Sequence, residues 1–220
     1  MHRMNFRDMF FLRKIVYRIR NFENRHSYNH GRNNRITKRG VVKVNSRIQI
    51  KGSRNKLVIE KGCVLEDALI HISGNDNIVV LNQHVFVMGA ELWVEDNNCS
   101  VEIREKTFIG HHTHIACTEG CSIIIGERSM ISSYVQIRAG DSHSILDMEG
   151  HRLNKGENVI VGPHCWIGEG AKILKGVKLE GDDIVSTGAI VTKSFPKNVL
   201  AGGVPAKIIR ENVNWDELRQ

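Results

Sequence analysis

The chain has 220 residues, the size of one domain or of one domain with a small arm. Apolar residues make up 41% and charged residues 25%, so the composition predicts a folded globular protein and excludes a disordered one. No apolar run approaches the roughly 18 residues of a membrane-spanning helix. We also expect no secretory signal, because no uninterrupted apolar segment precedes a small-residue cleavage site.

The net charge of +7 is concentrated at the N-terminus. Residues 1–40 carry 11 Lys and Arg but only 2 Asp and Glu, which gives a net charge of +9. Residues 41–220 carry 20 Lys and Arg and 22 Asp and Glu, which gives a net charge of −2. We therefore expect a basic, helical N-terminal arm over 1–40, and a body without the basic face that nucleic acid requires. Such an arm either makes a peripheral contact with an anionic membrane surface or caps the end of the body.

The cysteines are odd in number and form no CxxC pair. Without a secretory signal, reduced thiols in the cytoplasm are the expectation, and most of these positions suit a buried apolar side chain. We therefore expect a cytoplasmic protein, which a membrane contact of its arm would hold at the inner face of the membrane. The cysteines are Cys63, Cys99, Cys117, Cys121 and Cys165.

An internal repeat with a period of 22 runs over residues 52–139. It places aliphatic residues in three columns, with small or polar residues between them, as expected for stacked coils of one solenoid. The columns are Leu57, Val79, Val101 and Ile123; Ile59, Leu81, Ile103 and Ile125; and Leu65, Val87, Ile109 and Ile131.

From Val161 onward the period shortens to six. Six residues fit a short strand plus a corner, and three such units close a triangular coil of about 18 residues. A β-sandwich is the alternative for a chain rich in turns, but it does not predict a fixed six-residue column. We therefore predict a parallel β-helix. The column is Val161, Ile167, Ile173, Leu179, Val185 and Val191.

Three motifs in order resemble those of the hexapeptide-repeat acyltransferases. Val161–Gly168 is similar to the family's IGxxVWIG, Val185–Lys193 to its GAGSVVTK, and Ala201–Lys207 to its AGVPAK. The resemblance covers roughly residues 52–212 and is nearest to sugar O-acetyltransferases of the galactoside and maltose type and those that modify capsule or lipopolysaccharide.

The resemblance implies an all-β fold, a left-handed parallel β-helix, since periodicity alone does not fix the hand. The resemblance also implies a β-helix domain over 41–212, followed by a short C-terminal helix and a tail at 213–220. It further implies a homotrimer. The expected activity is acetyl transfer from acetyl-CoA to a sugar hydroxyl of a surface glycan, with coenzyme A as product and no metal.

The repeat is interrupted once, over 140–158. In the family, a loop at this place projects from the β-helix and bears a catalytic histidine, often followed by proline. Here His143 is followed by Ser144, so the match is partial. We expect His143 to be the general base, because a neutral histidine with a pKa of about 6.5 suits the removal of a hydroxyl proton. Asp141 either orients its imidazole, binds a sugar hydroxyl or stabilises a turn.

The family's coenzyme site lies in a groove between neighbouring subunits. By resemblance, Trp166 would line the thioester end, a backbone N–H near Gly168 and Glu169 would stabilise the oxyanion, and Thr187 would lie along the pantetheine arm. Cations near the nucleotide would bind its phosphates. The residues expected at the nucleotide end are Thr192, Lys193, Lys207 and Arg210.

The acceptor residues are predicted from the coils before the insertion. Trp93 would stack on a sugar ring, and His112 and His114 would lie beside it; alternatively, each is an exposed coil residue. The alternative is an amino group as acceptor, which would make the reaction N-acetylation of an amino sugar or nucleotide-sugar.

The same coils also resemble the γ-type carbonic anhydrases, which hold zinc with three histidines at a subunit interface. The histidines available for this are His111, His112, His114, His143 and His164. That class lacks the inserted loop and the GVPAK ending.

Overall fold

The computed structural model describes residues 27–218. The predicted helix of the N-terminal arm lies outside these residues. In the described part of the chain, no helix is long and apolar enough to cross a membrane.

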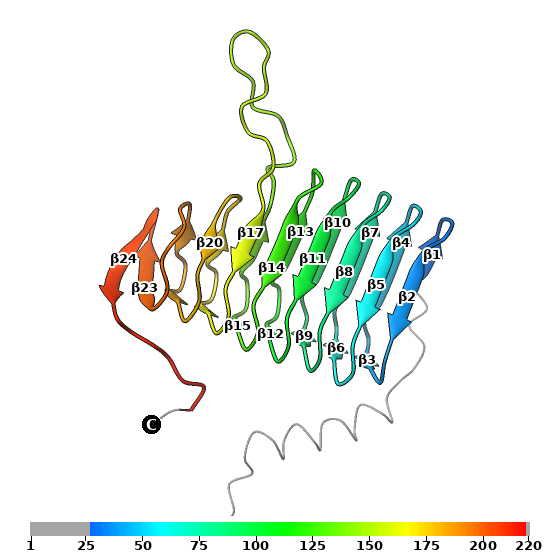
Figure 1. Cartoon of the computed structure of the whole chain (residues 1–220), viewed down its shortest axis with the longest axis horizontal. Coiled ribbons are helices and arrows are strands. Elements are labelled where there is room, and N and C mark those ends of the chain that lie inside the picture. Colours follow the sequence, from blue (N-terminus) through cyan, green and yellow to red (C-terminus); the bar gives the residue numbers. More distant parts are fainter. Residues whose placement is uncertain (1–26, 219–220) are drawn as a thin grey trace, which may run out of the picture.

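The described chain winds into a parallel β-helix with three flat sheets, and each coil contributes one strand to each sheet in turn (Figure 1). Sheet A contains β1 (Tyr28–His30), β4 (Arg47–Lys51), β7 (Leu69–Ser73), β10 (Glu91–Glu95), β13 (His114–Cys117), β16 (Gln136–Arg138), β19 (Lys172–Ile173) and β22 (Ile190–Val191). Sheet B contains β2 (Arg35–Lys38), β5 (Lys56–Ile59), β8 (Ile78–Leu81), β11 (Ser100–Ile103), β14 (Ser122–Ile125), β17 (Val159–Val161) and β20 (Lys178–Leu179). Sheet C contains β3 (Val42–Val44), β6 (Val64–Glu66), β9 (Phe86–Met88), β12 (Phe108–Ile109), β15 (Met130–Ile131), β18 (Trp166–Ile167), β21 (Ile184–Val185), β23 (Val199–Gly203) and β24 (Ala206–Glu211).

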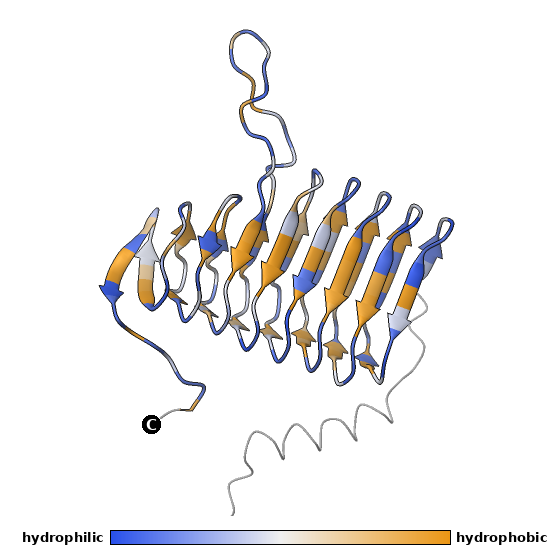
Figure 2. Ribbon diagram, viewed as in Figure 1, coloured by the Kyte–Doolittle hydropathy of each residue, from blue (hydrophilic) through white to orange (hydrophobic). Residues whose placement is uncertain are grey.

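The predicted aliphatic columns form the core. Leu57 on β5 stands in register with Val79 on β8, and both are fully buried. The six-residue column that starts at Val161 is buried in the same way. Because side chains alternate along each strand, one set points into the prism and the other outward, which gives the apolar stripes of Figure 2. Both periodicities are thereby confirmed.

The corners of the prism are built with residues in the left-handed backbone region, one per coil at the corner from sheet C to sheet A and two in most coils at the corner from sheet A to sheet B. Glycine, asparagine and aspartate adopt this conformation at the lowest cost, which accounts for their frequency between the columns. At the corner from sheet C to sheet A these residues are Asn45, Asp67, Gly89, His112, Tyr134, Gly170 and Gly188.

A buried asparagine ladder stabilises the corner from sheet A to sheet B. The Asn55 Oδ1 accepts a hydrogen bond from the Asn77 N–H at 3.0 Å, and the Asn77 Oδ1 accepts one from the Cys99 N–H at 2.8 Å. The Asn77 Nδ2 donates to the Asp96 carbonyl at 2.9 Å. Buried backbone groups that lack a strand partner are satisfied in this way.

All five cysteines are buried and none forms a disulfide. Burial raises the pKa of the Cys63 thiol to about 11 and that of Cys165 to about 12. Thiols with such pKa values remain protonated at neutral pH and are poor nucleophiles. This agrees with the expectation of buried, inert thiols.

Two boundaries differ from the sequence prediction. The solenoid begins at Tyr28, within the stretch 1–40 that was assigned to the arm, because β1 and β2 already pair with the second coil. The described residues contain no C-terminal helix, so that prediction is wrong. Instead, β23 and β24 pair antiparallel around the turn at Val204 and Pro205, and Ile208 and Ile209 favour the extended backbone.

Replacing Asn77 by alanine tests the ladder. The substitution leaves the buried Cys99 N–H and the partly buried Asp96 carbonyl without these partners, so we expect the free energy of unfolding to fall by about 2–4 kcal/mol. Urea denaturation followed by circular dichroism measures this. Asn158→Ala is the matched control, because Asn158 makes one exposed bond, to the Ser122 N–H, and its loss should cost less than about 1 kcal/mol. Equal losses would contradict the ladder's role.

Candidate active site

An inserted loop leaves the solenoid between β16 and β17, at the corner from sheet A to sheet B, and stands away from the body (Figure 1). Its root is cross-linked to the coils. The Arg152 guanidinium pairs with the Glu119 carboxylate at 2.7 Å, and the other carboxylate oxygen accepts the Gly156 N–H at 3.1 Å. These bonds hold the pKa of the Glu119 carboxyl below its usual value. The loop root is therefore fixed relative to the sheets.

Asn154 organises the part of the root that carries His143. The Asn154 side chain is buried, and its Nδ2 donates to the Asp141 carboxylate at 2.9 Å and to the His143 carbonyl at 2.8 Å. Its Oδ1 accepts the Ile145 N–H at 2.7 Å. The backbone of His143 is thus held from both sides, while its side chain is exposed to solvent.

The Asp141 carboxylate is engaged with Lys175. The Lys175 ammonium donates to it at 2.5 Å and to the Asn154 carbonyl at 3.0 Å. Lys175 and Asn154 hold the pKa of the Asp141 carboxyl below its usual value, so it is ionised at neutral pH. Among the described residues, no hydrogen bond joins this carboxylate to the His143 ring. The geometry gives Asp141 the role of anchoring the loop, which is nearest to the predicted turn-stabilising role.

A pocket of about 210 Å³ opens on the outer face of sheet A beside this root. Ser142, the residue before His143, forms part of its wall, and Trp93 and His114 form another part. Two of the three predicted acceptor residues are therefore brought next to the root of the inserted loop. The full lining is Trp93, Glu95, His114, Ala116, Thr118, Arg138, Gly140 and Ser142.

The Trp93 ring is held in place by polar and aromatic neighbours. Its Nε1 donates to the Glu91 carboxylate at 2.9 Å, and its ring lies 4.3 Å from the His71 ring, centroid to centroid. Burial lowers the pKa of His114, and the Arg138 charge lowers it further, so His114 is neutral at neutral pH. A neutral imidazole both donates and accepts hydrogen bonds, which suits contact with sugar hydroxyls.

His112 does not reach this pocket. It occupies the corner from sheet C to sheet A, where its ring stacks on Tyr134 at 4.8 Å and lies 6.3 Å from the ring of His111. The prediction that His112 would lie beside Trp93 fails because His112 takes the left-handed corner position, with φ 56°, which directs the chain around the corner.

Sheet C carries the predicted thioester end of the coenzyme site. Trp166 on β18 is 38% exposed and lies 6.0 Å from the ring of Trp215, which folds back from the C-terminal segment. Trp215 in turn stacks on His164 at 4.6 Å, with nearly parallel rings, and donates its Nε1–H to the His164 carbonyl at 2.8 Å. These aromatic side chains form one continuous surface on sheet C.

The corner after β18 stacks directly on the corner after β21. A Cβ on Gly168 would meet the Thr187 nitrogen at 2.6 Å, so only glycine allows this close approach. The Gly168 N–H donates to the Val185 carbonyl at 2.8 Å and is committed to the sheet. Gly168 is therefore not available as the predicted oxyanion donor, and the Glu169 N–H is the remaining candidate. Glu169 and Thr187 are both exposed at this edge.

The four residues expected at the nucleotide end fall into two groups. Lys207 and Arg210 are exposed on β24, in the same sheet as Trp166. Thr192 and Lys193 follow β22 in sheet A and lie at the corner towards sheet B, not at the corner of Gly168 and Thr187. One chain therefore does not gather all four around Trp166.

The loop corner and sheet C lie on opposite sides of the prism. A coil passes from sheet A through sheet B to sheet C, so the corner between A and B faces away from sheet C. His143 stands at that corner, whereas Trp166 points outward from sheet C. Within one chain the predicted base and the predicted coenzyme surface are therefore separated by the body of the solenoid.

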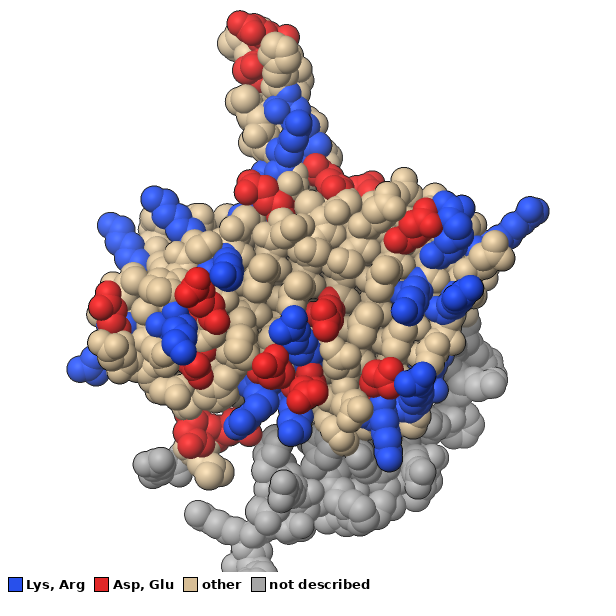
Figure 3. Space-filling view, viewed as in Figure 1, with Lys and Arg blue, Asp and Glu red and all other residues tan. Residues whose placement is uncertain are grey.

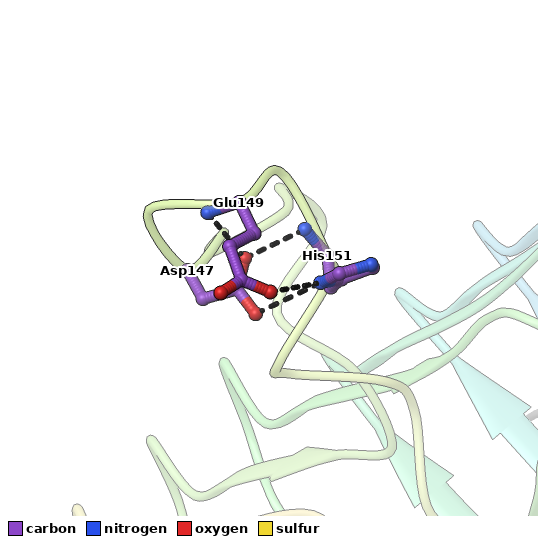
Figure 4. Close-up of side chains that lie close together, drawn as sticks. All are labelled: Asp147, Glu149 and His151. Atoms are coloured by element: carbon purple, nitrogen blue, oxygen red, sulfur yellow. Dashed lines mark hydrogen bonds and ion pairs between the residues drawn. The ribbon is translucent and has the colours of Figure 1, made fainter.

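The loop tip holds a small polar cluster (Figure 4). The Asp147 Oδ1 accepts the N–H groups of Glu149 and His151 at 2.9 and 2.8 Å, and the His151 Nδ1 lies 3.2 Å from the other Asp147 oxygen. Among residues 27–218 this is the one group of three with the spacing of metal ligands. These bonds close the tip of the loop.

Charge is unevenly distributed over the solenoid. Basic side chains gather over the first coils, and the loop carries acidic side chains near its tip with basic ones below (Figure 3). Residues 27–66 contain 10 Lys and Arg against 2 Asp and Glu. The basic character predicted for the arm therefore continues into the first coils of the body.

Comparison with known proteins decides the family. No family model matches the chain. The solved polysialic acid O-acetyltransferase OatWY is 30% identical, with a TM-score of 0.82 over 89% of this chain and 92% of that one. The chain belongs to the hexapeptide-repeat acyltransferases. The polySia-specific acetyltransferase NeuO is also similar, with 29% identity and a TM-score of 0.82 over 87% of this chain and 88% of that one. The expected left-handed β-helix is thereby confirmed.

Similarity to curated sequences is confined to a shorter segment. The polysialic acid O-acetyltransferase of Escherichia coli O1:K1 / APEC is 35% identical over 78 residues, which is 35% of this chain and 25% of the relative. In the curated relatives that the chain matches first, the matched segment spans 25% to 31% of the relative's length.

Sequence reasoning missed residues that the structure places at the site. Asn154 and Lys175 hold the loop, and Trp215 covers sheet C, but no repeat or motif marks them because their contacts span the insertion or the C-terminal segment. Arg138 could have been found from the sequence. It stands 22 residues after Ala116, which stands 23 after Trp93, so the repeat itself aligns these three on sheet A.

Replacing Trp215 by alanine tests the aromatic surface. Loss of the stack on His164 should release residues 212–218, so hydrogen exchange at the Val213 N–H, which is bonded to the Asn198 carbonyl, should become much faster. Trp166 fluorescence should become more accessible to acrylamide. Trp215→Phe keeps the stacking ring but lacks the N–H donor. Its exchange rate and its acrylamide quenching should therefore lie between those of the wild type and those of Trp215→Ala. Exchange and quenching unchanged by Trp215→Ala would show that the segment is held by other contacts.

Proposed function

We propose that this protein is an acetyl-CoA-dependent O-acetyltransferase that modifies a sugar hydroxyl of a surface glycan, such as a capsule or lipopolysaccharide. One observation carries the proposal: in a hexapeptide-repeat acyltransferase, the loop that carries His143 is cross-linked to the coils and contributes the preceding residue, Ser142, to the wall of a pocket that also contains Trp93. Aromatic faces suit the apolar faces of sugar rings, and the neutral His114 suits their hydroxyls.

The names of the relatives support an oxygen acceptor on a glycan. OatWY and the Escherichia coli relative are named polysialic acid O-acetyltransferases, and another relative is named galactoside O-acetyltransferase. N-acetylation of an amino sugar would use the same base, so the two products must be told apart chemically. An O-acetyl ester is cleaved by mild alkali, whereas an N-acetyl amide is not.

His143 supplies the proton chemistry. Its imidazole accepts the proton of the sugar hydroxyl while the oxygen attacks the thioester carbonyl. The C–S bond then breaks, and the proton passes from the imidazole to the departing thiolate, which leaves as coenzyme A. The Glu169 N–H is the candidate donor to the oxyanion. Transfer is direct, and the buried thiols of the described residues have no part in it.

The edge of sheet C fits an extended ligand with phosphates at one end. Trp166 and Thr187 are exposed there, and the Lys207 ammonium and the Arg210 guanidinium on β24 supply cations. Acetyl-CoA bound along this edge would present the activated acetyl group near Trp166. Lys207 and Arg210 would neutralise its phosphates.

The separation of the two half-sites supports a homotrimer. Because His143 and Trp166 face opposite sides of the prism, one subunit's base must meet the coenzyme surface of its neighbour. A closed ring of three equivalent interfaces satisfies this for every subunit. We further propose a cytoplasmic enzyme whose basic arm and basic first coils attract an anionic glycan or the inner membrane surface.

Substituting His143 tests the mechanism. His143→Ala should lower kcat about 10²–10⁴-fold in an assay of acetyl transfer from acetyl-CoA to sialic-acid oligosaccharides, because general-base catalysis contributes that much. Binding of acetyl-CoA should be nearly unchanged. His151→Ala, at the loop tip, is the matched control and should keep full activity. Unchanged turnover in His143→Ala would remove His143 from the role of base.

A further inference from the structure

The pocket on sheet A contains a guanidinium with no acidic partner. Arg138 lies half-buried on β16, and no ion pair among the described residues includes it. Its Nε and the Thr118 Oγ1, both in the pocket wall, are shielded from solvent and have no hydrogen-bond partner. The neighbouring cations are committed, since Arg152 pairs with Glu119 and Lys175 with Asp141.

We propose that this pocket binds a carboxylate-bearing sugar residue of the acceptor, with Arg138 as the ligand of the carboxylate. This inference rests on the proposed function and deepens it, because it names the chemical class of the acceptor. An arginine fork matches the two oxygens of a carboxylate, and an incoming carboxylate would remove the cost of leaving a half-buried charge unpaired.

The shape of the pocket follows from the register of three strands. Trp93 on β10, Ala116 on β13 and Arg138 on β16 occupy the same position in neighbouring coils. Two strand spacings of about 4.8 Å separate the two large side chains, and the small Ala116 leaves the floor between them open. The gap is wide enough for one sugar ring, with its apolar face on Trp93 and its carboxylate towards Arg138.

The remaining wall suits the hydroxyl groups of the same sugar. Glu95, the one carboxylate in the lining, is exposed at the rim and accepts hydrogen bonds from hydroxyls. His114 is neutral because burial and the Arg138 charge lower its pKa, so its imidazole can both donate a hydrogen bond to a hydroxyl and accept one from it. Ser142 forms the wall on the side of the loop, so a bound sugar would lie beside the loop root that carries His143.

Binding of a sialic-acid oligosaccharide to the full chain, measured by calorimetry without acetyl-CoA, tests the site. The same oligosaccharide with its carboxylates reduced to alcohols is the matched ligand. Arg138→Gln should weaken binding of the acidic form at least tenfold and leave binding of the reduced form unchanged. Arg104→Gln, an exposed arginine paired with Glu102 and Glu127, is the matched control and should bind as the wild type does.

A second variant fills the pocket without touching a charge. Ala116→Leu places a larger side chain between Trp93 and Arg138 and should weaken both forms of the oligosaccharide. Retained trimer and unchanged KM for acetyl-CoA would show that both variants are folded.

The possible results distinguish a failure of the proposed binding site from a failure of the proposed acetyl transfer. Arg138-dependent binding of the acidic form without acetyl transfer would support the site and contradict the proposed function. Transfer to neutral sugars that Arg138→Gln does not affect would overturn the site and leave the function standing. Equal binding of the acidic and reduced forms by the wild type, or no binding of either, would also overturn it.

Discussion

Side chains stacked in register from coil to coil are the interaction on which this molecule depends. Aliphatic residues of the core stack on their counterparts in the neighbouring coils, and one continuous cluster runs from Ile48 to Ala206, with a smaller cluster of Val42, Val64 and Phe86 beside it. The same register orders the outer faces, where it sets Trp93, Ala116 and Arg138 in one row on sheet A. The proposed acceptor surface therefore arises from the same register that builds the core, with the small side chain of Ala116 between two large ones.

The single interruption of this register carries His143, the proposed base. A flexible insertion would not hold a base in place, but Asn154, Lys175 and the pair of Glu119 with Arg152 tie the loop root to the coils. The exposed imidazole of His143 is thus presented from a fixed backbone. Because the loop leaves at the corner opposite sheet C, the proposed reaction needs the coenzyme surface of a second subunit.

Periodic features could be predicted from the sequence, and features that depend on one irregular contact could not. The columns and the β-helix followed from the spacing of aliphatic residues, and the three late motifs indicated the family. From the sequence alone, His112 could not be told apart from residues on the outer face of sheet A, such as Trp93 and His114. In the structure it lies at a corner, with a left-handed backbone. The Gly168 N–H is committed to Val185 by a bond that only the stacked coils reveal. The short segment after β23 reverses into a strand because Pro205 and the preceding glycines make a turn there.

The role of the loop anchor could not be predicted for the same reason. Asp141 was considered as a partner of His143 because the two are close in sequence. In the structure, Lys175, which lies beyond the insertion, takes the carboxylate and keeps its pKa low. Contacts between residues that the repeat does not align have no signature in one sequence, and they are the contacts that distinguish this site from a plain solenoid.

The most direct measurement is a thermal-shift titration of the full chain with acetyl-CoA. A ligand that binds only the folded state raises the melting temperature once its concentration passes the dissociation constant. We predict that acetyl-CoA binds saturably and that the melting temperature keeps rising as its concentration increases beyond the dissociation constant. We also predict that Trp166→Ala weakens the binding and makes the rise in melting temperature smaller. A melting temperature unchanged by millimolar acetyl-CoA would contradict these predictions.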